Sequence, residues 1–551
     1  MEANIAAMVE WPLSALFQKI ISFSNRKVLI CLLMAVLPIA IRVPALRWVP
    51  FPSPWIHDEF SYLLAADTFA SGRLTNPPHP MWVHFETFDE IFQPTYASKY
   101  PPGQSLFMAF GQRYLGHPWF GVCISFGLMC GCLCWMLQGF LPPVYALLGT
   151  LVAMGEFSLF GYWMDSYWGG SVAAMGGSLV LGAVPRLAKS TSASASWLAS
   201  LGLMILALSR PFEGLVVTFA AVAGLLWWRH HLGHRLLGLF AVRVLVPCVL
   251  ICLAGVSWML YYNYRVSGDP FLMPYTVHER TYVASPIFYL LPAPPEPIYR
   301  HEIMRKNWIG WEKLYYLAAR HNPLRTVLAF WDLVPFFAST LTFLPAVAGL
   351  LAFAKSPKMR VTIGALAALW AAMLLMKSWH PHYYAPGVGL LLIPTMYSLR
   401  WLRVRAGRAG EAAILLFVVC CFFRGLLYDS IHEYKTRTPT QQEDATDRVK
   451  AVSHNGERHL VIVRYAADHD PLHEFVFNSA DIDHSFIIWA RDMGDAKNRE
   501  LIDYYPDRRV WLLEPDSPTL KVTPYPKQPL ADARDSVESL TLRKGSGLDG
   551  K

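Results

Sequence analysis

Charged residues are scarce in this chain, and that scarcity bounds its class. Only 16% of the 551 residues are charged and 54% are hydrophobic, whereas a soluble domain carries about 25% charged residues. Runs such as 244–262 and 333–353 contain no charge and have the length of a bilayer span. A soluble protein can bury one such helix but not a long series of them. The composition therefore excludes a soluble multidomain protein and predicts an α-helical polytopic membrane protein.

Cysteine is absent from every hydrophilic stretch of the sequence. The nine cysteines all fall inside apolar runs: Cys31, Cys123, Cys130, Cys132, Cys134, Cys248, Cys252, Cys420 and Cys421. This placement argues against a disulfide framework and against a zinc site. The cysteines are expected to pack as small polarisable side chains within helices.

The net charge is +8, which in a soluble protein would point toward nucleic acid. Here the basic residues form short clusters between apolar runs, a pattern typical of orientation signals in membrane proteins. We therefore expect membrane lipids as partners and no nucleic acid.

About eleven spans are predicted, near 28–45, 119–137, 144–163, 170–185, 196–209, 214–228, 239–262, 330–353, 361–377, 384–398 and 411–428. The positive-inside rule places the N-terminus inside, together with basic loops at 186–189, 229–235, 355–360 and 400–408. The stretch 100–114 cannot be a further span, because a crossing there would reverse every later loop. It is predicted to be a helix on, or dipping into, the outer leaflet.

Three hydrophilic regions then lie on the outer face. Residues 1–429 form a transmembrane module with outer loops at 46–118 and 263–329, and residues 430–551 form a small α/β extracytoplasmic domain. Within that domain, 459–465, 485–489 and 509–513 read as strands, and 498–505 reads as a helix.

Acids, cations and aromatic residues concentrate at this outer level. Charged groups near a membrane are costly to desolvate, so each is a candidate functional residue. The candidates are His57, Asp58, Glu59, Tyr62, Lys99, Tyr100, Asp165, Arg210, Glu213, His278, Arg280, His380, His382 and Tyr383. Cations of this kind hold a phosphate, and a carboxylate can take a proton from an attacking hydroxyl or amine.

These motifs resemble the membrane glycosyltransferases of the GT-C class, in particular the protein O-mannosyltransferases and the aminoarabinose transferase that modifies lipid A. The resemblance covers about residues 28–430. Its most specific part is the acid pair Asp58-Glu59 with Tyr62 following, together with the element Lys99-Tyr100-Pro101-Pro102-Gly103 in the first outer loop. The weaker parts are Asp165 after the third span, Arg210 after the fifth, and His278 and Arg280 in the second outer loop. Some relatives have an Arg where this chain has Ser61.

The resemblance implies an enzyme that moves a sugar from a polyprenyl-phosphate donor to a hydroxyl or amine of a glycan, lipid or protein, with inversion at the anomeric carbon. Asp58 is then the expected base, Glu59 orients it or binds substrate, and Asp165 holds the acceptor or sugar. Lys99, Arg210 and Arg280 are expected to grip the lipid phosphate. Metal independence is the preferred expectation, since no dense carboxylate cluster is present, and a divalent Mg²⁺ or Mn²⁺ is kept as the alternative.

Structural alternatives stand beside these roles. Asp58 and Asp165 are also favoured helix caps, and Arg210 with Glu213 could be a structural ion pair. At the level of function, the alternatives are a membrane transporter or lipid-linked glycan flippase, and a ligase of lipid-linked polymers. A transporter usually shows repeat symmetry and polar residues at mid-span, and neither is evident in the sequence. The expected location is the cell inner membrane, with the site and the C-terminal domain outside.

Overall fold

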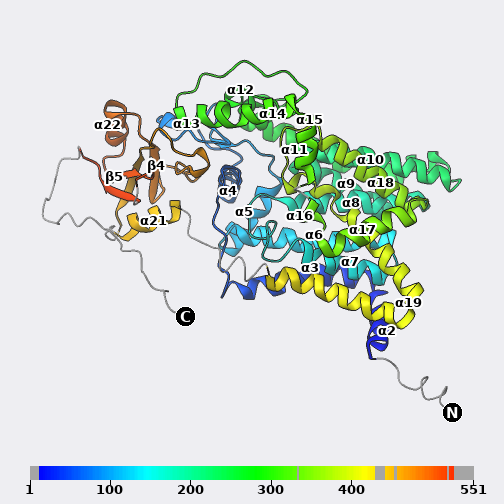
Figure 1. Cartoon of the computed structure of the whole chain (residues 1–551). Helices are drawn as coiled ribbons and strands as arrows, with labels where there is room; N and C mark the ends of the chain where they lie inside the picture. The colour runs from blue at the N-terminus through cyan, green and yellow to red at the C-terminus, as the bar shows by residue number, and fades with distance from the viewer. Residues whose placement is uncertain (1–11, 332–333, 429–440, 452–455, 518–519, 527–551) are drawn as a thin grey trace, which may run out of the picture.

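The computed structural model describes residues 12–331, 334–428, 441–451, 456–517 and 520–526, and most of them are helical (Figure 1). The main helices are α2 (Pro12–Ser24), α3 (Lys27–Ala45), α4 (His57–Ala70), α5 (Gly103–Leu115), α6 (Trp119–Phe140), α7 (Pro143–Glu156), α8 (Gly170–Lys189), α9 (Ala193–Ser209), α10 (Pro211–His231), α11 (Val242–Ser267), α12 (Pro274–Tyr282), α13 (Glu302–Arg305), α14 (Leu314–His321), α15 (Pro323–Phe330), α16 (Val334–Phe337), α17 (Thr340–Phe353), α18 (Pro357–Met373) and α19 (Gly389–Phe423).

Within the described residues, six helical segments are long and apolar enough to cross a membrane: Lys27–Ala45, Trp119–Phe140, Gly170–Lys189, Pro211–His231, Val242–Ser267 and Ala385–Leu427. The chain is therefore a membrane protein. Helix α8 lies at the centre of the bundle, almost wholly buried, whereas α11 is almost wholly exposed. Small residues allow the close packing of α8: a Cβ on Gly177 would lie 1.9 Å from the carbonyl oxygen of Pro386. The segment that follows the His380–Tyr383 motif is thus fixed directly against the core.

Three of the predicted spans differ from what the hydropathy pattern predicts, because two are joined and one is interrupted. The predicted spans 384–398 and 411–428 are the two arms of one helical segment, which bends sharply at Gly407. The predicted span 330–353 is helical in the pieces α16 and α17, and the carboxylate of Glu156 accepts hydrogen bonds from the backbone and side chain of Ser339 between them. The total of eleven spans stays a prediction.

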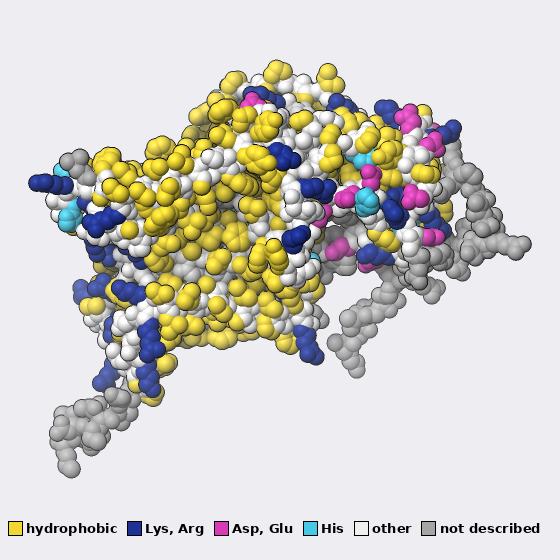
Figure 2. Space-filling view, turned by 180° about the vertical axis from the view of Figure 1, so that it is seen from behind, with side chains coloured by type: hydrophobic (Ala, Val, Ile, Leu, Met, Phe, Trp, Pro, Cys, Tyr) yellow, Lys and Arg dark blue, Asp and Glu magenta, His cyan; other side chains and the backbone are white. Residues whose placement is uncertain are grey.

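The surface charges separate toward the two ends of the molecule. In Figure 2, hydrophobic side chains cover the middle, Lys and Arg gather at the end that carries the N-terminal segment, and nearly all Asp and Glu lie at the opposite end. Segments that carry the basic loops predicted to lie on one side of the membrane contact one another. Arg229, for example, donates to the carbonyl of Leu187, and Lys358 donates to that of Phe140.

The acidic end is built from the two outer loops and the C-terminal region (Figure 1). The first loop contains α4, α5 and the short antiparallel pair β1 (Glu90–Ile91) and β2 (Ala97–Ser98). The second contains α12 to α14 and the π-helix η3 (Lys306–Lys313). Helix α5 has 13 residues, too few to cross a bilayer, and its position at the leaflet surface stays a prediction.

The C-terminal region contains a four-stranded sheet in the order β4-β3-β5-β6. Its strands are β3 (Arg458–Val463), β4 (Ile487–Arg491), β5 (Arg508–Glu514) and β6 (Lys521–Pro524), with helix α22 (Asp495–Tyr504) before β5 and α21 (Gln441–Ala451) before β3. Strand β3 is parallel to both neighbours, and β6 is antiparallel to β5. The predicted strands and helix are present within a few residues, and the predicted boundary at 430 lies outside the described residues.

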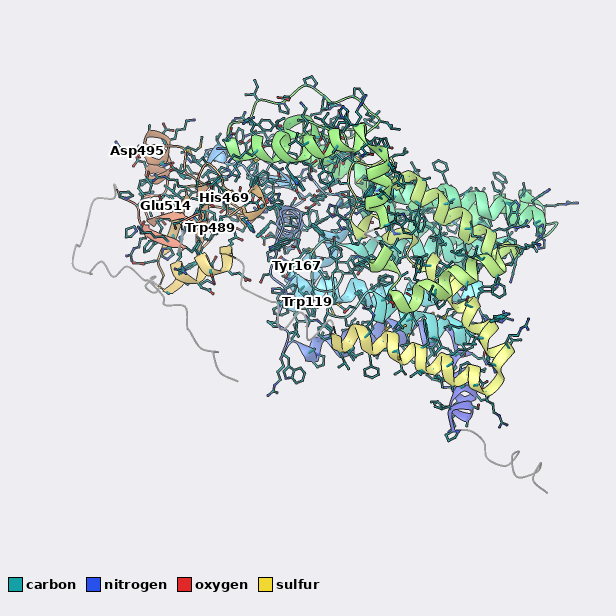
Figure 3. The ribbon with its side chains drawn as sticks, in the orientation of Figure 1. Trp119, Tyr167, His469, Trp489, Asp495 and Glu514 are labelled. Atoms are coloured by element: carbon teal, nitrogen blue, oxygen red, sulfur yellow. The ribbon has the colours of Figure 1, made fainter. Side chains whose placement is uncertain are left out.

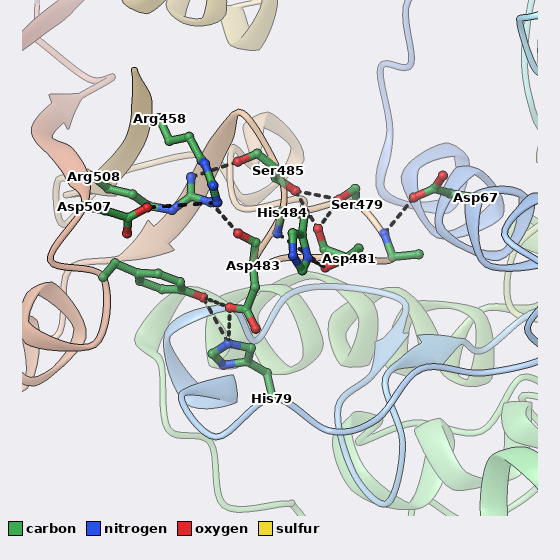
Figure 4. A network of polar contacts seen from close by, with 12 residues as sticks. Asp67, His79, Arg458, Ser479, Asp481, Asp483, His484, Ser485, Asp507 and Arg508 are labelled. Carbon is green, nitrogen blue, oxygen red and sulfur yellow. Dashed lines mark hydrogen bonds and ion pairs between the residues drawn. The ribbon is translucent and has the colours of Figure 1, made fainter. Parts of the chain in front are cut away.

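This sheet packs against the first outer loop. Apolar side chains of the loop, Phe85 and Phe92 among them, share a buried core with strands β3, β4 and β5. Figure 4 shows the polar edge of the contact, where Nε2 of His79 lies 3.0 Å from the carboxylate of Asp483. The hydroxyl of Tyr505 donates to the same carboxylate, at 2.6 Å. The backbone N–H of Ala480 donates to Asp67 of α4, at 2.8 Å. The two regions are therefore one packed body rather than separate units.

Candidate active site

A cavity of about 660 Å³ lies among the outer loops and the helix ends of the bundle. We call it the site cavity. Nine of the fourteen candidate residues line it: His57, Asp58, Tyr62, Lys99, Tyr100, Arg210, Glu213, His380 and Tyr383. They come from α4, the segment before α5, the α9–α10 junction and the segment before α19. Residues far apart in sequence therefore meet in one place.

Asp58 lies in the first turn of α4 and is half-buried in the cavity wall. It is not the helix cap: the cap position is Ile56, and Glu59 reaches back to that residue's backbone. The Tyr100 hydroxyl donates to Oδ1 of Asp58. Among the described residues no hydrogen bond occupies Oδ2 of Asp58, which leaves this oxygen able to accept a proton from a bound substrate.

Asp89 is the lining residue that the sequence pattern missed most clearly. Its carboxylate lies 2.6 Å from Nζ of Lys99 and 3.3 Å from the Tyr100 hydroxyl, and it adopts a left-handed backbone with φ of 61°. Burial disfavours the ammonium of Lys99, but Asp89, Asp58 and Glu279 outweigh that effect and raise the Lys99 pKa above its usual value. The charge of Lys99 is thus committed to neighbouring acids.

Arg210 differs from the other two cations of the cavity. Lys377 pairs with Glu312 and Lys99 pairs with Asp89, whereas Arg210 forms no ion pair with any carboxylate in the described part of the chain. Its guanidinium lies over the ring of Tyr383, 4.9 Å from the ring centre. Arg210 is therefore the cation best able to accept an incoming anion.

Glu59 is buried behind the cavity rather than lining it. Its oxygens accept hydrogen bonds from the backbone N–H groups of Trp55 and Tyr167, each at 2.8 Å. Burial raises the pKa of Glu59 to about 7, and these N–H groups oppose the rise. Glu59 does not line the cavity, because its carboxylate is turned toward these backbone groups. This placement favours the expected orienting role at the start of α4 over direct substrate contact, and both roles stay predictions.

Asp165 is also placed behind the site. It forms a buried ion pair of 2.8 Å with Arg42, whose guanidinium lies 4.7 Å from the centre of the Trp119 ring. Figure 3 shows Trp119 and the nearby Tyr167 at the end of the helical part that faces the sheet. This ion pair joins α3 to the segment before α8, and Asp165 does not line the cavity. Its expected role in holding the acceptor or sugar stays a prediction that this placement does not favour. A lone Arg inside the first apolar run was the available signal for the ion pair.

Three further candidates do not line the cavity. His278 is fully buried against Trp308, 5.4 Å between ring centres, and burial lowers its pKa. Arg280 is exposed on α12 and does not line the cavity, so its expected phosphate contact stays a prediction. His382 is buried, with Nδ1 2.6 Å from the hydroxyl of Tyr162, and its ring lies behind that of His380.

Aromatic side chains form much of the remaining wall. Trp308 and Trp311 come from the π-helix η3, and Tyr315 follows on α14. π-Helical segments are rare and are frequently found at functional sites. Trp311 and Tyr315 are each about half exposed, so they lie where the cavity meets its surroundings. Flat aromatic faces of this kind suit a sugar ring or an isoprenoid chain.

The C-terminal region contributes directly to the cavity. Leu472 lines it, and the carbonyl of Pro471 lies 2.8 Å from Nε2 of His57. Phe477 stacks on Phe60 of α4, with ring centres 4.0 Å apart. The loop after β3 therefore closes the cavity beside Asp58.

A metal site has no obvious donor set here. Among the residues that the structure describes, no group of three or more His, Cys, Asp or Glu side chains is arranged to hold one ion. All nine cysteines are free thiols. Five acids do line the cavity, Asp58, Asp89, Glu213, Glu279 and Glu312, but two of them are already paired with lysines.

No protein-family model matches the chain, and no curated protein matches its sequence. Similar solved structures include an oligosaccharyltransferase of Archaeoglobus fulgidus, with 11% identity, a TM-score of 0.47, and coverage of 89% of this chain and 69% of that one. They also include ArnT of Cupriavidus metallidurans in the apo state, with 12% identity, a TM-score of 0.49, and coverage of 88% and 92%. ArnT has also been solved bound to undecaprenyl phosphate. Both belong to the class that the motifs resemble, and at this level of similarity the function rests on the site itself.

Proposed function

We propose that the protein is an inverting glycosyltransferase that moves a sugar from a polyprenyl-phosphate donor to a hydroxyl or amine of an acceptor. The reaction would take place on the outer face of the cytoplasmic membrane. The observation that carries the proposal is one cavity with a half-buried carboxylate, Asp58, and an arginine, Arg210, that forms no ion pair among the residues that the structure describes. Chemistry of this kind needs a base at one side of the scissile bond and positive charge at the other.

In the proposed step, Oδ2 of Asp58 takes the proton of the acceptor hydroxyl or amine. The acceptor atom attacks the anomeric carbon, and the bond from that carbon to the phosphate oxygen breaks. The lipid phosphate leaves with the electron pair, and Arg210 neutralises its charge. Tyr100 holds Asp58 in position through its hydrogen bond to Oδ1, and Lys99 and Asp89 hold Tyr100.

The structure favours different roles for the two lining cations that were expected to grip phosphate. Lys99 is 7% exposed and paired with Asp89, so moving it onto a donor would leave a buried carboxylate uncompensated. Arg210 can bind an anion without breaking an ion pair. In this proposal Arg210 supplies the charge that Mg²⁺ or Mn²⁺ would otherwise supply, and turnover does not require a metal.

The test is sugar release from a panel of polyprenyl-monophosphate sugars by the purified full-length protein, with crude acceptor extract, in EDTA and in added Mg²⁺. Asp58→Asn is assayed beside wild type, and Glu302→Gln, an exposed acid on α13, is the matched control. Turnover of a donor by wild type and by the control, but not by Asp58→Asn, supports the proposal. Absence of turnover for every donor would favour a transporter, a flippase or a polymer ligase instead.

A further inference from the structure

A second cavity, of about 740 Å³, lies at the opposite, basic end of the molecule. We call it the basic cavity. Helix α2, the start of α7 and the bend of α19 form its walls, and its charged lining residues are Arg400, Arg403, Arg408 and Glu411. Three cations against one acid make it a site for an anion. None of these residues contributes to the site cavity.

The bend of α19 creates this cavity. Gly407 has φ of 53° and ψ of −124°, a conformation that side-chain-bearing residues rarely adopt. After the bend the chain folds back so closely that a Cβ on Gly410 would lie 2.7 Å from the carbonyl oxygen of Leu402. Arginines from both arms of the helix are therefore brought to one space.

The three arginines are not equivalent. Arg403 donates to Glu411 at 3.0 Å, and its guanidinium lies 4.9 Å from the centre of the Phe17 ring on α2. This contact anchors α2 against α19. Arg400 and Arg408 are exposed, and within the described residues neither forms an ion pair. Their guanidinium groups are available to a phosphate, which binds arginine well through paired hydrogen bonds.

Exposed apolar side chains accompany the basic cavity. Val404 lines the cavity and is 76% exposed. Helix α2, which forms one wall through Ser14, Gln18 and Ile21, also carries Leu13 and Leu16, which are 42% and 46% exposed. An amphipathic helix of this kind lies in the membrane interface, with its apolar side chains toward the acyl chains. A ligand that combines a phosphate with acyl chains fits the arginines and these apolar side chains, whereas a soluble anion fits the arginines alone.

We propose that the basic cavity binds the headgroup of an anionic phospholipid from the leaflet opposite the site cavity. Basic pockets between membrane helices on the cytoplasmic side are suited to such headgroups. Bound lipid would join α2 to the bend of α19. This proposal does not depend on the glycosyltransferase activity.

The experiment is native mass spectrometry of the detergent-solubilised full-length protein with phosphatidylglycerol or phosphatidylcholine of the same acyl chains. The variant Arg400→Ala/Arg408→Ala is compared with Arg360→Ala/Arg405→Ala. The control removes two exposed arginines at the same end that do not line the cavity. Melting temperatures without lipid confirm that both variants fold.

We expect preferential binding of phosphatidylglycerol by wild type and by the control, and binding about 30-fold weaker by Arg400→Ala/Arg408→Ala. Equal weakening in both variants would overturn the proposal, because it would indicate general surface charge. Equal binding of the two lipids would overturn it as well. Displacement of phosphatidylglycerol by inorganic phosphate at equal concentration would show that a soluble anion is the ligand, and would also contradict it.

Discussion

The two ends of this molecule each place three cations in a cavity, but the cations have different surroundings. In the site cavity, Lys99 and Lys377 are paired with acids and only Arg210 has no carboxylate partner within the described residues. In the basic cavity, only one acid, Glu411, faces three arginines. The first arrangement can hold one anion while a carboxylate acts beside it. The second can only bind. The comparison indicates that the acids paired with a cation, more than the presence of the cation, determine whether a charged cavity can support catalysis or only binding.

The largest expected effect concerns the paired cation of the site cavity. Lys99→Met should lower the free energy of unfolding by about 3–5 kcal/mol, because it leaves Asp89 buried without its partner. Arg408→Ala in the basic cavity should change it by less than about 0.5 kcal/mol, since an exposed residue is lost. Unfolding in detergent measures both. Adding Asp89→Asn to Lys99→Met should restore part of the lost stability, because it removes the uncompensated carboxylate. Equal stability of Lys99→Met and Arg408→Ala would contradict the difference proposed between the two cavities.

The second prediction uses the pH dependence of Glu59. Below pH 4.5 its carboxyl is protonated in the folded and the unfolded chain. Between pH 4.5 and about 7 only the unfolded chain releases the proton. The free energy of unfolding therefore falls as pH rises through this range, by up to about 3 kcal/mol. Above pH 7 the contribution of Glu59 is constant, because both states have released the proton. Melting curves of wild type against Glu59→Gln, which stays neutral, measure this. A stability difference between the two proteins that does not change with pH would rule out a buried, proton-binding Glu59.

The third prediction separates the two kinds of unpaired arginine. Arg210→Gln should lower kcat/KM for the lipid-phosphate donor about 100-fold, because the leaving phosphate loses its counter-charge. Arg405→Gln, an exposed arginine outside both cavities, should stay within twofold of wild type. Initial rates over a range of donor concentrations give both values. An equal loss in both variants would assign the effect to total charge.

The smallest expected effect concerns the shape of the basic cavity. Gly407→Ala should cost about 1–2 kcal/mol of stability, because alanine is strained at this positive φ. Gly364→Ala, in the open interior of helix α18, should be neutral or slightly stabilising. Melting temperatures of the two variants test the difference, and a stable Gly407→Ala protein would argue against a constrained bend.

Much of this arrangement could be predicted from sequence because it depends on local signals. Hydropathy and charge predict the strands of the C-terminal sheet, and they separate the acidic, aromatic loops from the basic loops at the other end of the molecule. The break between α16 and α17 could not be predicted, since it depends on Glu156 reaching Ser339 from another helix. The bend at Gly407 could not be predicted either, because its only signal in the sequence is one glycine in a stretch rich in arginine.

The site itself was predictable in place but less so in detail. The sequence indicated that the candidate residues lie near one surface of the membrane. It did not indicate which of the adjacent acids, Asp58 or Glu59, lines the cavity. Asp165 has the local context of a candidate acid, but its partner Arg42 lies 123 residues earlier in the chain. Asp89 has no motif, and its importance depends on the long-range contacts of Lys99 and Tyr100.

The most direct test of the central claim, that Asp58 is the base of the site cavity, is the rate of sugar transfer by Asp58→Asn. We expect a loss of about 1,000-fold, with the melting temperature within a few degrees of wild type and with donor binding retained. Transfer at the wild-type rate by a folded Asp58→Asn protein would contradict this claim.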